Sequence, residues 1–150
     1  MHDFTNRAEL DRLQGGATKW ARAGQALDAA PHLLEDVTYS VGDSLTYRWA
    51  TTDRLASPHL VGHRRYLLVV AALDGDVHVE VAATSQLTPL GPYDDLSDRQ
   101  IFDGTGDLTV VPAGGILVVD IDEAARILPS PLTAAVTLHV TVEGATFHNK

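Results

Sequence analysis

Side chains able to bind or act on a small ligand are concentrated in three short segments of this chain. They are GDSLTYR (42–48), GHRRY (62–66) and FHNK (147–150). Arginine, histidine and tyrosine next to apolar runs such as LLVVAAL (67–73) are costly to bury unless they hydrogen-bond to each other or to a polar ligand. The clustering therefore predicts one shared pocket or docking surface.

Two residues have side chains suited to acid–base chemistry. His63 lies in the GHRRY segment, and Glu123 is the plausible acid or base of DIDEAAR (120–126). Opening a cyclic hemiacetal needs a general acid and a general base, so this pair could serve a metal-independent sugar mutarotase. The side chains predicted to bind a sugar or a partner protein are Tyr47, Arg48, His63, Arg65, Tyr66, Arg99, Arg126, Phe147, His148 and Asn149.

A structural interpretation stands beside each functional one. The paired arginines of GHRRY could bridge nearby carboxylates or protect a sheet edge. Residues 120–126 are expected to form a turn or one helical turn, with Asp120 or Asp122 as its cap and Arg126 paired with an acid. Residues 147–150 could be a frayed tail. In 42–48, Thr46 and Arg48 share one strand face and Tyr47 takes the other.

Other motifs point away from cofactor chemistry. Seven histidines occur without HxH or HxxxH spacing, which favours surface or singly hydrogen-bonded roles over metal ligation. Cysteine is absent, so thiolate catalysis and disulfides are excluded. Gly104-Thr105-Gly106 lacks the context of a phosphate loop and is read as a turn. We expect no cofactor and no metal.

Length and charge restrict the class of protein. A chain of 150 residues suits a single domain, 1–150, with its own core. The net charge of −9 disfavours binding to nucleic acid or to an anionic membrane. The start is polar, without an apolar signal region, and the longest apolar run (66–73) is too short to span a bilayer. A soluble, cytoplasmic protein is expected.

Helices are predicted only near the start. Thr5 or Asn6 can cap a helix over 7–13, and a second helix is expected over 17–29. Trp20, Ala23 and Leu27 recur at helical spacing in the second helix. Residues 1–30 should therefore form a helical segment packed on the rest of the domain.

The remaining chain predicts an all-β fold. Strands are expected over 37–41, 44–50, 65–73, 76–83, 107–111, 115–121 and 134–143. Asp74-Gly75 predicts a tight hairpin with positive φ at both positions, and 112–115 predicts a second turn. In 76–83, Val77, Val79 and Val81 share one face, and His78 and Glu80 the other. Short strands without alternating helices indicate an antiparallel sandwich or barrel.

The order of the motifs carries a resemblance. GDSLTYR, GHRRY, a YDDxxDR-like segment (93–99), DIDEAAR and VTVEGATFHNK (140–150) together resemble the small subunits of evolved β-galactosidases, a group within the wider YhcH/YjgK/YiaL family. The match covers nearly the whole chain from residue 18. It implies a cupin-like double-stranded β-helix, which is an antiparallel jelly-roll barrel. Wider members of the family are described as sugar anomerases or isomerases.

The resemblance also implies where the wider family holds a metal. The family's metal ligands are replaced here by Val61, Leu68, Val70 and Ala125, none of which can bind a metal. His63 is the one ligand of the family's set that remains. Because a stable site needs at least three suitable protein ligands, the resemblance implies no metal for this chain.

These expectations favour an accessory role in carbohydrate metabolism. The chain is too short for the barrel of ~250 residues that hosts β-galactosidase chemistry, and it shows no obvious carboxylate pair. We therefore predict a non-catalytic subunit that binds a large catalytic β-galactosidase chain and supports its activity. The alternatives are a small sugar mutarotase or anomerase and a sugar-binding domain without chemistry. Galactosides or related sugars are the expected ligands, and a homo-oligomer is also compatible with the sequence.

Overall fold

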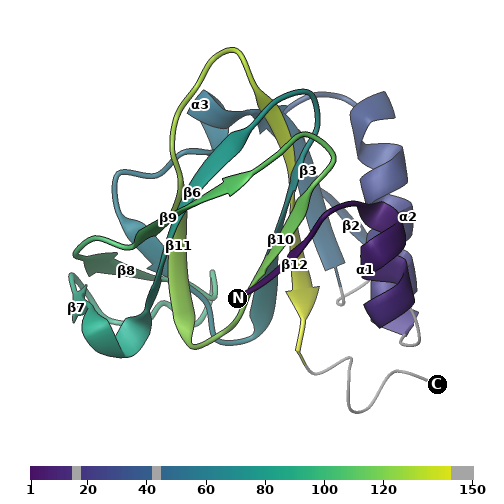
Figure 1. The fold of residues 1–150 in the computed structure, drawn as a ribbon. Coiled ribbons are helices and arrows are strands. Elements are labelled where there is room, and N and C mark those ends of the chain that lie inside the picture. Colours follow the sequence, from purple (N-terminus) through teal and green to yellow (C-terminus); the bar gives the residue numbers. More distant parts are fainter. Residues whose placement is uncertain (15–17, 42–44, 143–150) are drawn as a thin grey trace.

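The computed structural model describes residues 1–14, 18–41 and 45–142, whose strands form two antiparallel six-stranded sheets (Figure 1). Sheet A has the order β1-β10-β5-β12-β3-β2 and sheet B the order β7-β8-β4-β11-β6-β9. The strands of sheet A are β1 (His2–Phe4), β2 (Tyr39–Val41), β3 (Leu45–Thr51), β5 (Tyr66–Ala72), β10 (Ile116–Val119) and β12 (Ala134–Thr141). Those of sheet B are β4 (Leu60–Gly62), β6 (Val77–Ala83), β7 (Thr88–Pro89), β8 (Gln100–Asp103), β9 (Asp107–Val111) and β11 (Glu123–Ile127).

The strand order is that of a jelly roll. From β3 to β6 the chain alternates between sheets A and B, and from β9 to β12 it alternates again. This produces two facing four-stranded sets, β3-β12-β5-β10 and β4-β11-β6-β9, which is the arrangement of a cupin-like double-stranded β-helix. The predicted all-β, cupin-like fold is therefore confirmed.

The predicted hairpin at Asp74-Gly75 is wrong. Strands β5 and β6 belong to different sheets, so these residues carry the chain across the barrel instead of closing a ladder. Neither residue has a positive φ, and the Asp74 carboxylate accepts a hydrogen bond of 3.0 Å from the backbone N–H of Ala134. The reason lies in β5, which is apolar on both faces and therefore occupies the middle of sheet A, between β10 and β12.

The turn at 112–115 is present and also joins the two sheets. Gly114 has φ +82°, and the backbone N–H of Gly115 donates to the carbonyl of Pro112 at 2.7 Å. The turn leads from β9 in sheet B to β10 in sheet A.

Residues 123–127 form strand β11 and not the expected helical turn. Ala124, Ala125 and Ile127 are buried, and the strand pairs with β4 on one side and β6 on the other. The turn is confined to the preceding residues, where the N–H of Glu123 donates to the carbonyl of Asp120 at 3.2 Å. Alanine has little preference for strands, so the central position in sheet B, and not local propensity, decides the conformation.

Five helical elements occur in the described residues. The α-helices are α1 (Arg7–Gln14), α2 (Thr18–Ala29) and α3 (Thr52–Leu55), and the 3-10 helices are η1 (Ala30–His32) and η2 (Thr84–Gln86). Asn6 is the residue that caps α1, because its Oδ1 accepts a hydrogen bond of 2.9 Å from the N–H of Glu9. Among the described residues, no helix is long and apolar enough to cross a membrane.

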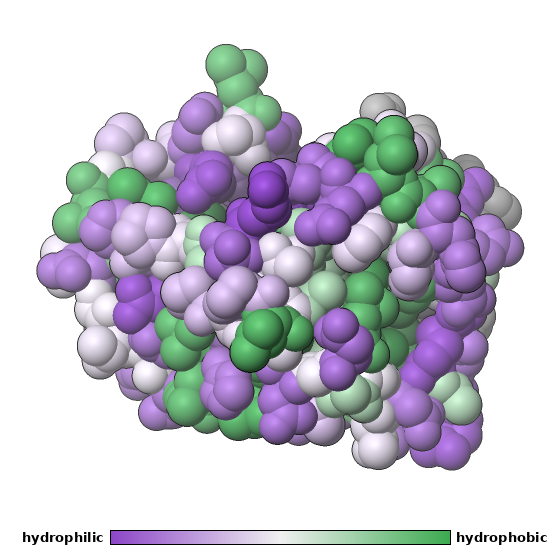
Figure 2. Space-filling view, turned by 90° about the horizontal axis from the view of Figure 1, so that it is seen from above, coloured by the Kyte–Doolittle hydropathy of each residue, from purple (hydrophilic) through white to green (hydrophobic). Residues whose placement is uncertain are grey.

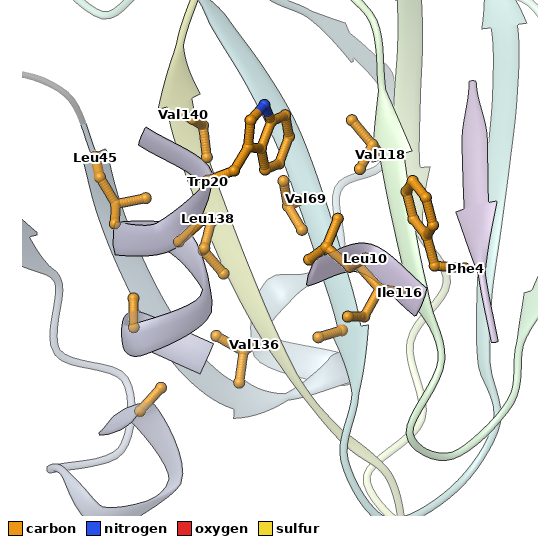
Figure 3. Packing of buried hydrophobic residues seen from close by; sticks show 14 residues of the cluster. Phe4, Leu10, Trp20, Leu45, Val69, Ile116, Val118, Val136, Leu138 and Val140 are labelled. Atoms are coloured by element: carbon orange, nitrogen blue, oxygen red, sulfur yellow. The ribbon is translucent and has the colours of Figure 1, made fainter. Parts of the chain in front are cut away.

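Helices α1 and α2 lie against the outer face of sheet A (Figure 1). As predicted, Trp20 and Ala23 are buried there and Leu27 packs beside them. Figure 3 shows Trp20 and Leu10 over side chains of β5, β10 and β12. This apolar layer is one of the protein's cores.

A second core fills the space between the sheets. Val77, Val79 and Val81 point into it, whereas His78 and Glu80 face outward, as the alternation predicted. Sheet A forms the other side of this core with residues from β5, β10 and β12, which are Val70, Ala72, Leu117, Val119 and Ala135. Both faces of sheet A are therefore buried, one by helices and one by sheet B.

Candidate functional site

A cavity of about 430 Å³ lies between the two sheets. Inner-face residues of both sheets line it, which places it inside the barrel. One part of the wall is apolar and contains Val61, Leu68, Ala125 and Ile127. The polar part contains Arg48, Arg54, His63, Arg99, Thr137 and His139. The volume is in the range of small-molecule sites.

Strand register brings three of the polar side chains to the cavity. Arg48 lies opposite Thr137, and Thr46 lies opposite His139, in the β3–β12 ladder. Tyr47 points to the other face and stacks on Tyr39 with ring centroids 5.7 Å apart. The predicted division of this strand between two faces is confirmed, and Tyr47 lies outside the cavity.

Two histidines meet inside the cavity. The rings of His63 and His139 pack edge to face with centroids 5.0 Å apart. His63 Nδ1 lies 2.7 Å from the backbone carbonyl of Asp98, so Nδ1 must donate and carries the proton. Burial lowers the pKa of both histidines, that of His139 to about 4. Both rings are therefore neutral near pH 7.

The GHRRY segment is held in place by Asp98. Its carboxylate accepts hydrogen bonds from the backbone N–H groups of Arg64, at 2.9 Å, and of Arg65, at 3.0 Å, and from the Tyr93 hydroxyl. Burial by itself would raise the pKa of Asp98, but these hydrogen bonds outweigh it and keep the pKa below its usual value. Asp98 therefore fixes the position of His63, although it was not among the residues that the sequence analysis selected.

The arginines of GHRRY bind the same loop and not the cavity. Arg65 donates to the carbonyl of Asp95 at 2.5 Å, and the Arg64 guanidinium lies 4.1 Å from the Tyr93 ring centroid. Arg65 also lies 4.0 Å from the carboxylate of Asp95 and 3.9 Å from that of Asp98, which is the bridging of carboxylates that the structural interpretation expected. Tyr66 is half-buried at the first residue of β5, and His63 is the residue of 62–66 that lines the cavity.

Arg126 pairs with an acid, as predicted. Its Nη2 lies 2.8 Å and its Nε 3.2 Å from Oε2 of Glu80, and its Nη1 donates to the carbonyl of Pro58 at 2.6 Å. The hydrogen bond from Arg126 lowers the pKa of Glu80. Arg126 also lines the cavity, but its charge is already balanced on the outer side of sheet B.

Glu123 has partners of its own. Its Oε1 lies 2.7 Å from the Met1 ammonium group and accepts from the backbone N–H of Asp120 at 3.1 Å. Within the described part of the chain, it makes no hydrogen bond or ion pair with His63, and it is not among the residues that line the cavity. The hypothesised acid–base pair of His63 and Glu123 is therefore not assembled.

Arg99 differs from the other arginines of the cavity. It lines the cavity beside His63, and its guanidinium makes no hydrogen bond or ion pair with any described residue. Phe147, His148 and Asn149 lie outside the described residues. Val70 is packed in the core between the sheets.

Sequence reasoning missed His139, Thr137 and Arg54. His139 is half-buried and faces the barrel interior, so the expectation of surface or singly hydrogen-bonded histidines was wrong for this residue. A signal was present in β12, where Thr137 and His139 alternate with buried Val136, Leu138 and Val140. Polar residues at every second position of an otherwise apolar strand indicate a lined cavity or a solvated face.

No family model matches the chain. A search of solved structures finds similarity to a cupin protein from Bacteroides fragilis, with 12% identity and a TM-score of 0.41 over 73% of this chain and 80% of that chain. Hydroquinone 1,2-dioxygenase from Sphingomonas sp. TTNP3 has 13% identity and a TM-score of 0.47 over 83% and 72%. The Drosophila melanogaster CENP-C cupin domain has 12% identity and a TM-score of 0.40 over 73% and 72%. These likenesses carry no inference about activity, and the fold assignment rests on the strand order.

Proposed function

We propose that this chain is a binding module that holds a small, hydroxylated, acidic molecule, such as a sugar acid, in the cavity between its sheets. The observation that carries the proposal is the gathering of Arg48, Arg54 and Arg99 around one cavity in a chain of net charge −9. Guanidinium groups bind carboxylates and phosphates through paired, charge-assisted hydrogen bonds.

The other cavity residues suit the remainder of such a ligand. Neutral His63, neutral His139 and Thr137 can exchange hydrogen bonds with hydroxyl groups, and the apolar wall can contact ring C–H groups. This supports the sugar-binding alternative of the sequence analysis. The mutarotase alternative receives no such support, because Glu123 is engaged by Met1 and Asp120.

Titration of the full chain with D-galacturonate and with D-galactose by isothermal calorimetry tests the proposal. We expect galacturonate to bind and galactose, which lacks the acid, to bind at least ~10-fold more weakly, because a charge-assisted pair is lost. Arg99→Gln should weaken galacturonate binding to a similar extent. Arg12→Gln is the matched control, because Arg12 is an exposed arginine on α1. Equal binding of both sugars, or an unchanged affinity in Arg99→Gln, would contradict the proposal.

A second candidate is the accessory subunit of a large β-galactosidase, and a surface feature favours it. Strand β9 is at the edge of sheet B and, among the described strands, pairs only with β6. Its Leu108 and Val110 are 57% and 46% exposed. An open edge strand with apolar side chains is suited to pairing with another chain. Figure 2 shows that, on the face it views, apolar residues form separate patches among polar ones.

Co-expression and co-purification with a large β-galactosidase chain test the accessory role. We expect a stable complex that buries at least ~1,200 Å² and raises the activity of the large chain. Leu108→Lys/Val110→Lys should weaken the complex, whereas Leu132→Lys, at a residue that is 87% exposed and outside β9, should leave it intact. A large chain that is fully active alone and forms no complex would refute this role.

A further inference from the structure

Asp36 reaches two of the three arginines that supply the charge of the cavity. Its Oδ1 lies 3.5 Å from Nη1 of Arg48, and its Oδ2 lies 3.4 Å from Nη1 of Arg54. Asp36 itself does not line the cavity. Its two carboxylate oxygens therefore face two guanidinium groups in the way that a ligand's carboxylate would.

The backbone holds Asp36 in this position. Its φ is +62°, in the left-handed region that aspartate tolerates better than most residues. Its N–H donates to the carbonyl of Trp49 at 2.8 Å, and Trp49 Nε1 donates to the carbonyl of Leu33 at 2.9 Å. The segment 33–36 is thus fastened to β3 beside Arg48, which directs the Asp36 carboxylate to the arginines.

The two ion pairs are weak enough to be displaced. Both distances are long, and the side chains of Arg48, Arg54 and Asp36 are 36%, 61% and 32% exposed to solvent. Ion pairs open to solvent contribute little because water screens them and because two long side chains must be ordered. An anion that also contacts Arg99 inside the cavity can therefore replace Asp36 at these arginines.

We propose that Asp36 is a built-in competitor for the anionic ligand: its carboxylate occupies Arg48 and Arg54 until the ligand's acidic group displaces it. Asp36 thereby raises the ligand concentration that is needed to fill the cavity. This inference rests on the proposed binding of an acidic ligand in the cavity.

The test compares the affinity of the wild type and three variants of the whole 150-residue chain for D-galacturonate, with inorganic phosphate as a second probe, by isothermal calorimetry. Asp36→Asn keeps the size of the side chain, and Asp36→Gly tolerates the positive φ without any side chain. Glu35→Gln is the control, because Glu35 is the exposed neighbouring acid and its side chain makes no hydrogen bond or ion pair within the described residues. Thermal unfolding establishes that each variant is folded.

We expect both Asp36 variants to bind galacturonate about three- to tenfold more tightly than the wild type, the size of effect that two exposed ion pairs can have. Glu35→Gln should stay within about twofold, since only long-range screened charge is altered. Weaker binding in both Asp36 variants would show that Asp36 positions the arginines, and binding equal to that of Glu35→Gln would show that it does not compete. Either result overturns the inference while wild-type binding upholds the proposed function. If no protein of the set binds either anion, the proposed function fails and the inference fails with it.

Discussion

His63 and His139 come from opposite sheets and meet edge to face, with ring centroids 5.0 Å apart. His63 follows β4 of sheet B, and His139 lies on β12 of sheet A. The pair spans the interior of the barrel at the polar part of the cavity. Burial is the largest cause that lowers the pKa of His139; His63, Arg48 and Arg99 lower it further, and Asp98 acts in the opposite direction.

This environment predicts a loss of stability in mild acid. The pKa of His139 is lowered from 6.5 to about 4, so between these values the unfolded chain binds a proton that the folded protein does not. The free energy of unfolding should fall as the pH drops from 6.5 to 4, by an upper limit of ~3 kcal/mol from this residue. Urea unfolding at several pH values measures the slope.

Substitution of His139 tests whether this residue causes the dependence of the free energy of unfolding on pH. In His139→Gln the dependence on pH between 6.5 and 4 should become shallower, leaving the smaller contribution of His63, whose pKa is also lowered by burial. His78→Gln removes an exposed histidine on the outer face of β6 and serves as the control. An unchanged slope in His139→Gln would contradict the assignment.

Asp98 should be important for stability although it lies on a loop. Asp98→Ala leaves the N–H groups of Arg64 and Arg65 without their acceptor, and the side chain that it removes is only 5% exposed. We expect a loss of ~2–4 kcal/mol, which chemical denaturation would measure. Tyr93→Phe removes one of the hydrogen bonds to this carboxylate and should destabilise the protein less than Asp98→Ala does. Asp95→Ala, at an exposed residue of the same loop, should cost less than either.

The pair formed by Arg126 and Glu80 should show strong coupling. Both side chains are partly buried, and two guanidinium nitrogens contact Oε2 of Glu80. Arg126→Met should cost ~1–3 kcal/mol, because it leaves Glu80 with an unbalanced charge. In Arg126→Met/Glu80→Gln much of this loss should be recovered. A double-mutant cycle by urea denaturation measures the coupling, and additive losses would contradict it.

The helical layer should contribute directly to the stability of the barrel. Leu10, on α1, is 1% exposed and packs on sheet A, so Leu10→Ala should cost ~2–5 kcal/mol. Leu132→Ala, at a residue that is 87% exposed, is the matched control and should change stability by less than ~0.5 kcal/mol. A single cooperative transition of both proteins is expected, and an effect of Leu10→Ala limited to an early helical transition would argue against tight coupling of helices and barrel.

Strong local periodicity explains which parts of the fold were predictable. Helices α1 and α2 and the long strands β3, β5, β6 and β12 follow from apolar spacing, and their bounds agree with prediction to within a few residues. Five strands were not predicted: β1, β4, β7, β8 and β11. They are short or rich in alanine, so their conformation depends on neighbouring strands.

The candidate site divides in the same way. Four of the predicted site residues, Arg48, His63, Arg99 and Arg126, line the cavity, and polar residue types beside apolar strands were the signal that singled them out. Asp36, Asp98 and His139 were not selected, because the sequence around each of them does not indicate which residues it will contact. Each acquires its role from residues that are distant in sequence.

The amino-acid sequence alone determined the all-β class, the helical start and the alternation of β6, since these depend on side-chain spacing within single elements. Only the tertiary structure decided which sheet each strand joins, and thus that Asp74-Gly75 crosses between sheets instead of forming a hairpin. It also decided that Arg48, Arg54, Arg99, His63 and His139 share one cavity. The physical reason is that strand pairing and burial satisfy the whole barrel together, and no single segment contains that information.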